Sequence, residues 1–193
     1  MSYTVKVYNP KTDAKYLPEM KALADWGLSP GFFNDEVVKN IESNEYFCSI
    51  ALDDDDKVCC VSYGYLLDLN GAANELRCSA NEVASYFPGV TKFASHVGMA
   101  TRPDMQGQGI AKEMVKLHKK LAFPYADIIF NIVWNRKGAE KSIVAVIKHF
   151  GAEFLKTIPL YWYDEPDLYC TVCKGRCVCD CDIYYYTKDG FKL

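Results

Sequence analysis

Residues 106–111, Gln-Gly-Gln-Gly-Ile-Ala, decide the fold, because they place two glycines between an expected strand and an amphipathic helix. The run before them, residues 93–101, is apolar and rich in small side chains. After them, apolar residues recur at helical spacing: Ile110, Met114, Leu117 and Leu121. Glycine lets a ligand approach the backbone closely, and the N–H groups at a helix N-terminus attract anions. The stretch therefore predicts a cradle for a pyrophosphate.

Two common phosphate-binding motifs do not fit this stretch. A Walker loop needs Gly-Lys-Ser or Gly-Lys-Thr, but Ile110 and Ala111 follow the second glycine. A dinucleotide fingerprint needs a third glycine where Lys112 stands. The stretch instead resembles the Gln/Arg-x-x-Gly-x-Gly/Ala motif of the GNAT superfamily, the acyl-CoA-dependent N-acyltransferases, and residues 101–104 resemble the strand end and proline turn before it. Tight packing of a helix N-terminus alone is the competing interpretation.

The rest of the chain shows strand and helix patterns in the order of the GNAT fold, with the resemblance strongest over residues 3–163. Strands are expected at 3–8, 46–52, 57–69, 93–101, 127–134, 152–163 and 181–187, and helices at 17–27, 34–41, 79–88, 110–121 and 143–150. The resemblance implies an α/β (α+β) fold with a mixed, mostly antiparallel central sheet of about seven strands, flanked by helices and followed by a Cys-rich C-terminal loop. Residues 1–193 are expected to form one domain.

Composition narrows the possible partners. The 193 residues carry a net charge of −3, which gives no electrostatic footprint for nucleic acid or anionic lipid. No apolar run reaches the roughly 20 residues of a membrane-spanning helix, and the first residues lack the apolar core of a signal peptide. We therefore expect a cytoplasmic protein with a small-molecule or peptide partner, without nucleic acid or membrane.

The resemblance implies where acetyl-CoA binds. The cofactor would lie in a wedge between the fourth and fifth strands, with its pantetheine arm along the fourth strand and its pyrophosphate on the glycine turn. An asparagine after the fifth strand often contacts the arm in this family. The expected cofactor-binding residues are Met99, Ala100, Thr101, Gln106, Gly107, Gln108, Gly109, Ile110, Ala111 and Asn135.

The groups that would move protons depart from the family pattern. Family members commonly use a Glu or a water as base and a Tyr on the last helix as acid, but Ile147 stands where that Tyr is expected. His96 is the only titratable side chain inside the fourth strand, so it is a candidate for proton transfer, with a packed histidine as the alternative. Tyr161 and Tyr163, expected on the sixth strand, are candidates for protonating the thiolate or for lining an acceptor pocket.

Five of the nine cysteines fall within residues 170–181, and they predict a metal site. The run Cys170-x-x-Cys173 resembles a zinc knuckle, in which a glycine permits the tight reversal. Cys177, Cys179 and Cys181 alternate, so two of them can complete a four-sulfur site. Zinc is the first expectation for the ion, and the alternatives are an iron–sulfur cluster, a redox disulfide or free thiols without a metal.

The leading hypothesis is an N-acetyltransferase that moves an acetyl group from acetyl-CoA to a primary amine by direct attack. A CoA-binding metal or redox sensor of the same fold, without turnover, is the alternative. Four consecutive aspartates at 53–56 and aromatic runs at 31–33 and 161–163 favour a cationic or aromatic acceptor amine.

Overall fold

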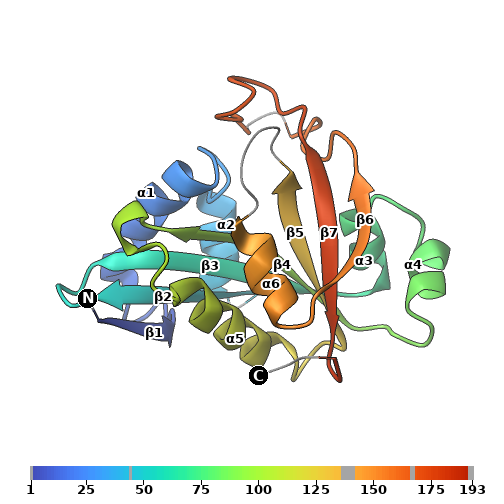
Figure 1. The fold of residues 1–193 in the computed structure, drawn as a ribbon, viewed down its shortest axis with the longest axis horizontal. Coiled ribbons are helices and arrows are strands. Elements are labelled where there is room, and N and C mark those ends of the chain that lie inside the picture. Colours follow the sequence, from blue (N-terminus) through green and yellow to red (C-terminus); the bar gives the residue numbers. More distant parts are fainter. Residues whose placement is uncertain (1, 44, 136–141, 166–167, 191–193) are drawn as a thin grey trace.

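The computed structural model describes residues 2–43, 45–135, 142–165 and 168–190. The strands are β1 Tyr3–Val7, β2 Tyr46–Asp53, β3 Val58–Leu67, β4 Phe93–Thr101, β5 Ile128–Asn135, β6 Glu153–Ile158 and β7 Asp180–Thr187. The α-helices are α1 Leu17–Gly27, α2 Asp35–Glu42, α3 Leu69–Glu75, α4 Ala80–Tyr86, α5 Ile110–Ala122 and α6 Ser142–His149 (Figure 1). One short 3-10 turn, Pro103–Met105, joins β4 to the glycine stretch.

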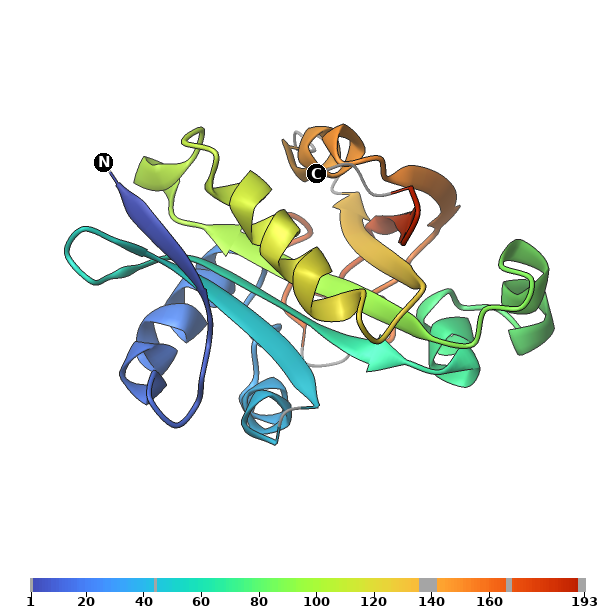
Figure 2. The ribbon, with the colours of Figure 1, turned by 90° about the horizontal axis from the view of Figure 1, so that it is seen from below.

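The described strands form one seven-stranded sheet in the order β1-β2-β3-β4-β5-β7-β6. Neighbouring strands are antiparallel except for β4 and β5, which are parallel. Figure 2 shows α5 on one face of the sheet and α1 and α2 on the opposite face, with α3 and α4 at one end. The predicted mixed, mostly antiparallel sheet flanked by helices is confirmed.

Capping side chains fix the starts of the short helices. Asn34 caps α2 by accepting a 3.0 Å bond from the Val37 N–H, as its position before an apolar face predicts. Ser79 caps α4 by accepting from the Glu82 N–H at 3.2 Å. These caps satisfy backbone donors that the first turn of a helix leaves without partners.

Two predicted strands were too long. The strand expected at 57–69 ends at Leu67, because Asp68 caps α3 by accepting a 2.7 Å bond from the Gly71 N–H. The strand expected at 152–163 ends at Ile158, because Pro159 has no N–H for the sheet and Leu160 takes a left-handed φ of 53°. Tyr161 and Tyr163 therefore lie in the β6–β7 connection rather than on a strand.

Apolar side chains fill both faces of the sheet. On one face, buried residues of α1 pack on β2 and β3; on the other, α5 and α6 cover the neighbouring strands. A further cluster joins α3 and α4 to β5, β7 and the β6–β7 connection. Among the described helices, none combines the length and apolar character that crossing a bilayer needs.

Candidate functional site

Strands β4 and β5 pair at one end and then part. Their parallel ladder covers only residues 93–96 of β4 and 128–131 of β5, so His96 and Asn131 form its last pair. Strand β4 stays paired with β3 as far as Thr101, and β5 stays paired with β7 as far as Asn135. The sheet therefore opens between two strands that each remain anchored on the outer side, and the backbone of residues 97–101 faces the opening.

A β-bulge at Val97 determines which face of the sheet the side chains of His96 and Val97 point to. Gly64 pairs with His96 and Tyr63 pairs with Gly98, so Val97 is the extra residue. His96 faces α5, where its ring lies 4.1 Å from that of His118. Val97 packs with the apolar cluster of α1 and α2 on the other face. The bulge thus separates His96 from the first residue of the opening.

The glycine turn leads from the opened strand into α5. Gly107 and Gly109 have φ values of 76° and 88°, a region that side chains with a Cβ disfavour, and Gly109 is the N-cap of α5. A Cβ on Gly107 would meet nothing within 4 Å, so conformation rather than space requires glycine there. The Gln106 Nε2 closes the turn by donating to the Thr101 carbonyl at 3.1 Å.

The amides of this turn are free to bind an anion. Within the described chain, the backbone N–H groups of residues 107–111 donate to no protein acceptor. They lie at the N-terminus of a 13-residue helix, where the aligned peptide dipoles favour negative charge. The turn therefore supplies a pyrophosphate-sized anion site at the wide end of the opening.

A cavity of about 490 Å³ meets the narrow end of the opening from the α1 and α2 side. Its lining includes Val97 and Ile132, the first residues beyond the last β4–β5 pair. The other lining residues are Gly31, Phe32, Asn34, Glu36, Val37, Tyr46, Tyr63, Tyr65, Asn74, Glu75, Arg77, Tyr161, Trp162, Glu165 and Leu168. Three carboxylates and one guanidinium line it, so its charge favours a cation.

Glu75 is the most constrained carboxylate of this cavity. Its Oε1 accepts a 2.7 Å hydrogen bond from Ser95 Oγ, and its Oε2 accepts one of 2.9 Å from the Tyr65 hydroxyl. The Tyr161 hydroxyl donates to the Glu75 carbonyl at 3.0 Å. Burial raises the pKa of Glu75, while the two side-chain hydrogen bonds act in the opposite direction. A carboxylate with a raised pKa accepts a proton more readily than an ordinary one, so Glu75 is a candidate base.

Comparison with known protein structures identifies the fold of this chain. No protein-family model matches this sequence, and no curated protein sequence matches it. NAA60 of Arabidopsis thaliana, solved with acetyl-CoA, superposes with a TM-score of 0.72 at 10% identity, covering 98% of this chain and 100% of that one. The NatC complex bound to Gag peptide and CoA gives 0.69 at 13% identity, covering 97% and 99%.

A GNAT superfamily phosphinothricin acetyltransferase from Sinorhizobium meliloti, solved with AcCoA, gives a TM-score of 0.58 at 14% identity over 97% of this chain and 89% of that one. The chain has the GNAT fold. At these identities the likeness concerns the fold alone. The motif in residues 106–111 and the element order thus predicted the GNAT fold correctly from the sequence.

Within the GNAT fold, the three predicted proton-transfer residues lie apart. Tyr161 lines the cavity, whereas Tyr163 is exposed. The Arg176 guanidinium carbon lies 3.9 Å from the centre of the Tyr163 ring. His96 is buried on the α5 face, where Nδ1–H donates to Asn131 Oδ1 at 3.3 Å and Nε2 accepts from Ser62 Oγ at 2.9 Å. Burial lowers the pKa of His96 to about 3.

The remaining predicted cofactor residues border the opening. Met99, Ala100 and Thr101 follow the parting of the strands on β4, and Asn135 ends β5 opposite them. The Asn135 Nδ2 donates to Asp182 Oδ1 on β7 at 3.2 Å. Glu75 is the functional candidate that the sequence analysis missed, because residues 70–78 were assigned to no helix or strand.

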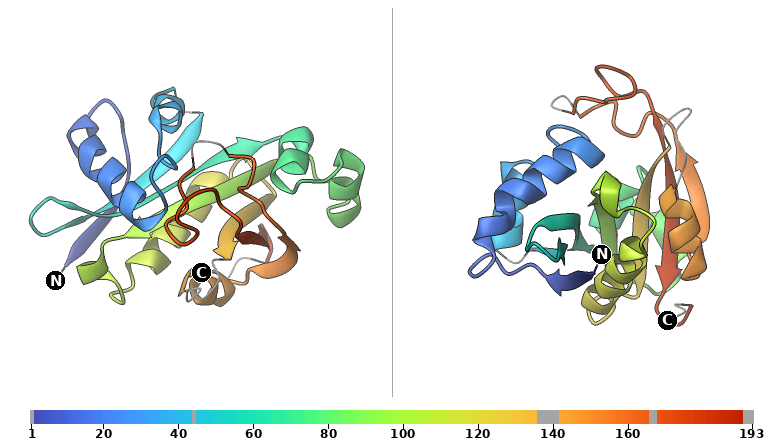
Figure 3. Two further views of the ribbon diagram at one scale, coloured as in Figure 1. Left: turned by 90° about the horizontal axis from the view of Figure 1, so that it is seen from above. Right: turned by 60° about the vertical axis from the view of Figure 1, so that its left-hand side comes forward.

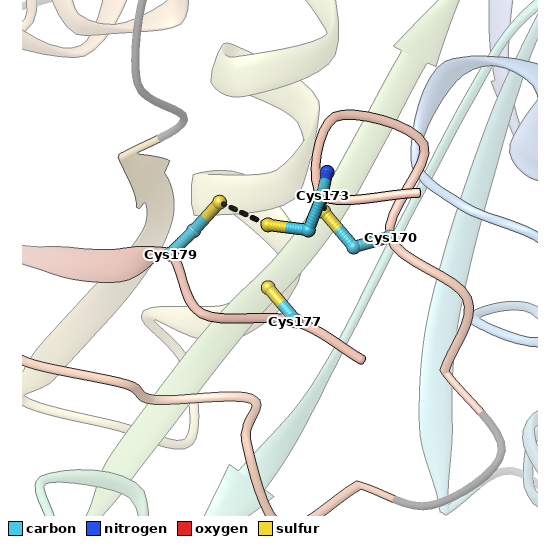
Figure 4. A group of neighbouring side chains, drawn as sticks. All are labelled: Cys170, Cys173, Cys177 and Cys179. Carbon is cyan, nitrogen blue, oxygen red and sulfur yellow. Dashed lines mark hydrogen bonds between the residues drawn. The ribbon is translucent and has the colours of Figure 1, made fainter. Parts of the chain in front are cut away.

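Four of the five clustered cysteines form a compact group in the β6–β7 connection. The sulfur atoms of Cys170, Cys173, Cys177 and Cys179 all lie within 4.8 Å of one another (Figure 4). Cys181 belongs to β7 and is buried in the apolar cluster, outside this group. The four-cysteine group can hold a metal ion, and the structure selects Cys177 and Cys179 from the alternating run.

Proposed function

We propose that this chain transfers an acetyl group from acetyl-CoA to a primary amine by direct attack. The observation that carries the proposal is the opening between β4 and β5, which joins the amides of the glycine turn at one end to the acidic cavity at the other. An elongated thioester with an anionic end fits such a path.

The opening accounts for the two ends of the cofactor. The backbone of residues 97–101 offers strand-like hydrogen-bonding groups to the pantetheine arm, beside Met99, Ala100, Thr101 and Asn135. The amides from Gly107 to Ala111 would hold the pyrophosphate, whereas the Gln106 N–H already donates to the Pro103 carbonyl. The NAA60 and phosphinothricin acetyltransferase structures, solved with acetyl-CoA, share the fold and support this assignment.

The cavity favours a cationic acceptor. Glu36, Glu75 and Glu165 line it, while Arg77 pairs with Glu165 at 3.5 Å. Aromatic rings, including those of Phe32 and Trp162, supply apolar walls on which the carbon chain of an amine can pack. A small-molecule or peptide amine that enters as an ammonium group fits this lining. The NatC complex, which was solved bound to Gag peptide and CoA, contains a chain of this fold, and this supports a peptide as one class of acceptor.

Glu75 and Tyr161 are assigned the proton transfers. The Glu75 carboxylate takes a proton from the bound ammonium group, and the neutral nitrogen attacks the thioester carbonyl carbon. A C–N bond forms and the C–S bond breaks, so the electron pair leaves on the CoA sulfur. Burial raises the pKa of Tyr161, so the hydroxyl is protonated when the thiolate forms and gives its proton to the sulfur. The proton held by Glu75 then returns to Tyr161 through solvent, which restores both groups. The nitrogen loses its second proton to solvent.

His96 is assigned a packing role instead. Both ring nitrogens already have partners, and the ring lies on the α5 face, away from the cavity. A pKa of about 3 leaves the ring uncharged at neutral pH and makes it a weak base. Tyr163 does not line the cavity, so it takes no part in the chemistry.

Binding of acetyl-CoA tests the cofactor site. Gly107→Trp places a bulky side chain beside the open amides, so we expect calorimetry to show at least about a hundredfold weaker binding of acetyl-CoA. Gly89→Trp is the matched control, because Gly89 has a φ of 78° and equally open surroundings but lies far along the chain in the α4–β4 loop. Equal affinities of the two variants would contradict the assignment.

A further inference from the structure

The described parts of the β6–β7 connection, residues 159–165 and 168–179, form one wall of the acceptor cavity. Tyr161, Trp162 and Leu168 line the cavity from this segment. Figures 1 and 3 show the connection above the sheet, between the β5–β7 end and α1. It contacts the α1–α2 link directly, because Ser29 Oγ donates to the Tyr169 carbonyl. The connection holds no helix or strand among its described residues, so something other than a backbone ladder must fix it.

The four-cysteine group lies at the C-terminal end of this wall. The Cys173 N–H donates to Cys170 Sγ at 3.3 Å, and Cys170 forms an antiparallel bridge with Gly175. Lys174 makes the reversal with a φ of 56°, so the tight turn comes from Lys174 rather than from the predicted glycine. Cys177 and Cys179 precede β7, and their side chains lie beside those of Cys170 and Cys173 on the turn (Figure 4). The sulfur atoms of the four cysteines, which are soft metal ligands, therefore lie around one point.

The spacing of the sulfur atoms selects a single ion. A tetrahedral ion with zinc–sulfur bonds of about 2.3 Å separates its ligands by roughly 3.8 Å. The Sγ atoms of Cys173 and Cys179 are 3.6 Å apart, and no pair in the group exceeds 4.8 Å. A disulfide needs about 2.05 Å between sulfur atoms. An iron–sulfur cluster must fit its own iron and sulfide atoms between the cysteines, which this compact group leaves no room for.

We propose that Cys170, Cys173, Cys177 and Cys179 bind one Zn²⁺, and that this ion holds the β6–β7 connection as a wall of the acceptor cavity. All four positions of the tetrahedron are filled by protein sulfur, so the ion has no open site for catalysis and acts structurally. Three of the four cysteines are buried, which protects the site from solvent. The role of the ion in holding a wall of the acceptor cavity rests on the proposed function, whereas the binding of zinc by the four cysteines does not.

Metal content tests the ion and its ligands. We expect elemental analysis of the anaerobically purified full chain to give about one zinc per chain. Cys170→Ser should lose the zinc, while Cys181→Ser should keep it, and the two positions are matched because both side chains are fully buried. Stoichiometric iron, no metal in the wild-type chain, or loss of zinc from Cys181→Ser alone would overturn the assignment.

Cobalt gives a second readout that does not depend on how the variants fold. Titration of the demetallated wild-type chain with Co²⁺ should give the visible bands of a tetrahedral ion with four thiolates, and zinc should displace it. Bands of an octahedral ion, or no bands from a chain that retains its fold by circular dichroism, would contradict a four-sulfur site.

Hydrogen–deuterium exchange tests the structural role without an acceptor substrate. Zinc removal should raise amide exchange about tenfold or more in residues 168–179 and 159–165, and leave β4 and α5 unchanged. Uniform acceleration along the chain, or none in residues 159–165, would contradict a local wall-holding role. Metal content, cobalt spectra and exchange are all independent of turnover, so failure of the acetyltransferase proposal would leave these results readable.

Discussion

Glu75 Oε1 accepts a 2.7 Å hydrogen bond from Ser95 Oγ, and this bond fixes a carboxylate of α3 onto strand β4. Ser95 pairs with Phe130 of β5, and the next pair, His96 with Asn131, is the last before the strands part. The carboxylate therefore sits beside the narrow end of the opening, where the proposed thioester and amine would meet. Helix α3, between β3 and β4, thus supplies a carboxylate base, which β4 itself lacks.

Removing the charge of Glu75 should impair turnover without impairing cofactor binding. Glu75→Gln keeps the size and one acceptor oxygen but cannot take a proton, so we expect kcat to fall by about 10²-fold or more. The acetyl-CoA Kd should stay unchanged, because the glycine turn binds the other end of the cofactor. Glu82→Gln on the exposed face of α4 is the control. Steady-state kinetics showing equal losses in both variants would remove Glu75 from the chemistry.

The Tyr65 hydroxyl should set the pH at which Glu75 becomes active. Its hydrogen bond to Oε2 lowers the pKa of Glu75, whereas burial raises that pKa above its ordinary 4.5. A base works above its pKa, so kcat/KM should fall as pH falls through the pKa of Glu75. Tyr65→Phe removes the lowering effect and should move this acid limb to higher pH. A limb that moves to lower pH, or stays in place, would contradict the assignment.

The two neighbouring tyrosines should differ in their effect on turnover. Tyr161 lines the cavity, and Tyr161→Phe removes the hydroxyl assigned to protonate the thiolate, so kcat should fall by about 10²-fold, the usual scale for losing a proton donor. Tyr163→Phe removes an exposed hydroxyl outside the cavity and should leave kcat unchanged. The comparison is made at saturating acetyl-CoA. If Tyr163→Phe is the impaired variant, the acid has been assigned to the wrong ring.

Sequence patterns predicted the parts of this molecule that backbone chemistry determines. The glycines at 107 and 109 need positive φ, and the apolar spacing after them needs a helix, so the turn and α5 were recognised. The parting of β4 and β5 followed only from the family resemblance. It depends on pairing partners, and nothing local in residues 97–101 reveals a missing neighbour.

The side-chain assignments depended on element ends and on long-range contacts. The strand expected at 57–69 included Asp68, so its role as the cap of α3 was missed, and Glu75 with it. Pro159 was the available signal that β6 ends before Tyr161. Alternation alone placed Cys177, Cys179 and Cys181 on one face, but β7 begins at Asp180 and takes Cys181 into the core.

The buried histidines should make the fold sensitive to acid. Burial and the charge of Lys119 lower the pKa of His96 from 6.5 to about 3, although the hydrogen bond with Asn131 acts to raise it. Burial and the neighbouring His96 also lower the pKa of His118. Both rings stay neutral in the folded chain and gain a proton on unfolding, so their stabilisation is full above pH 6.5 and is lost as pH falls toward 3.

Denaturant unfolding at several pH values measures this effect. Each proton taken up on unfolding lowers the free energy of unfolding by about 1.4 kcal/mol per pH unit. His96→Gln removes one of these protons, so the slope of unfolding free energy against pH should become shallower by about 1.4 kcal/mol per pH unit between pH 6 and pH 4. His149→Gln is the control, because solvent reaches that ring in the folded chain. Equal slopes for wild type and His96→Gln would contradict a neutral, buried His96.

The most direct test of the account is whether the chain makes an acetylated amine. Acetyl-CoA would be incubated with a panel of polyamines, lysine-like amines and peptides with free N-termini, and mass spectrometry would quantify CoA and acetylated amine together. We expect equal amounts of both products with a cationic member of the panel, and neither above background with Glu75→Gln. Tight binding of acetyl-CoA with no acetylated amine from any class would contradict the acetyltransferase assignment and favour a sensor that only binds CoA.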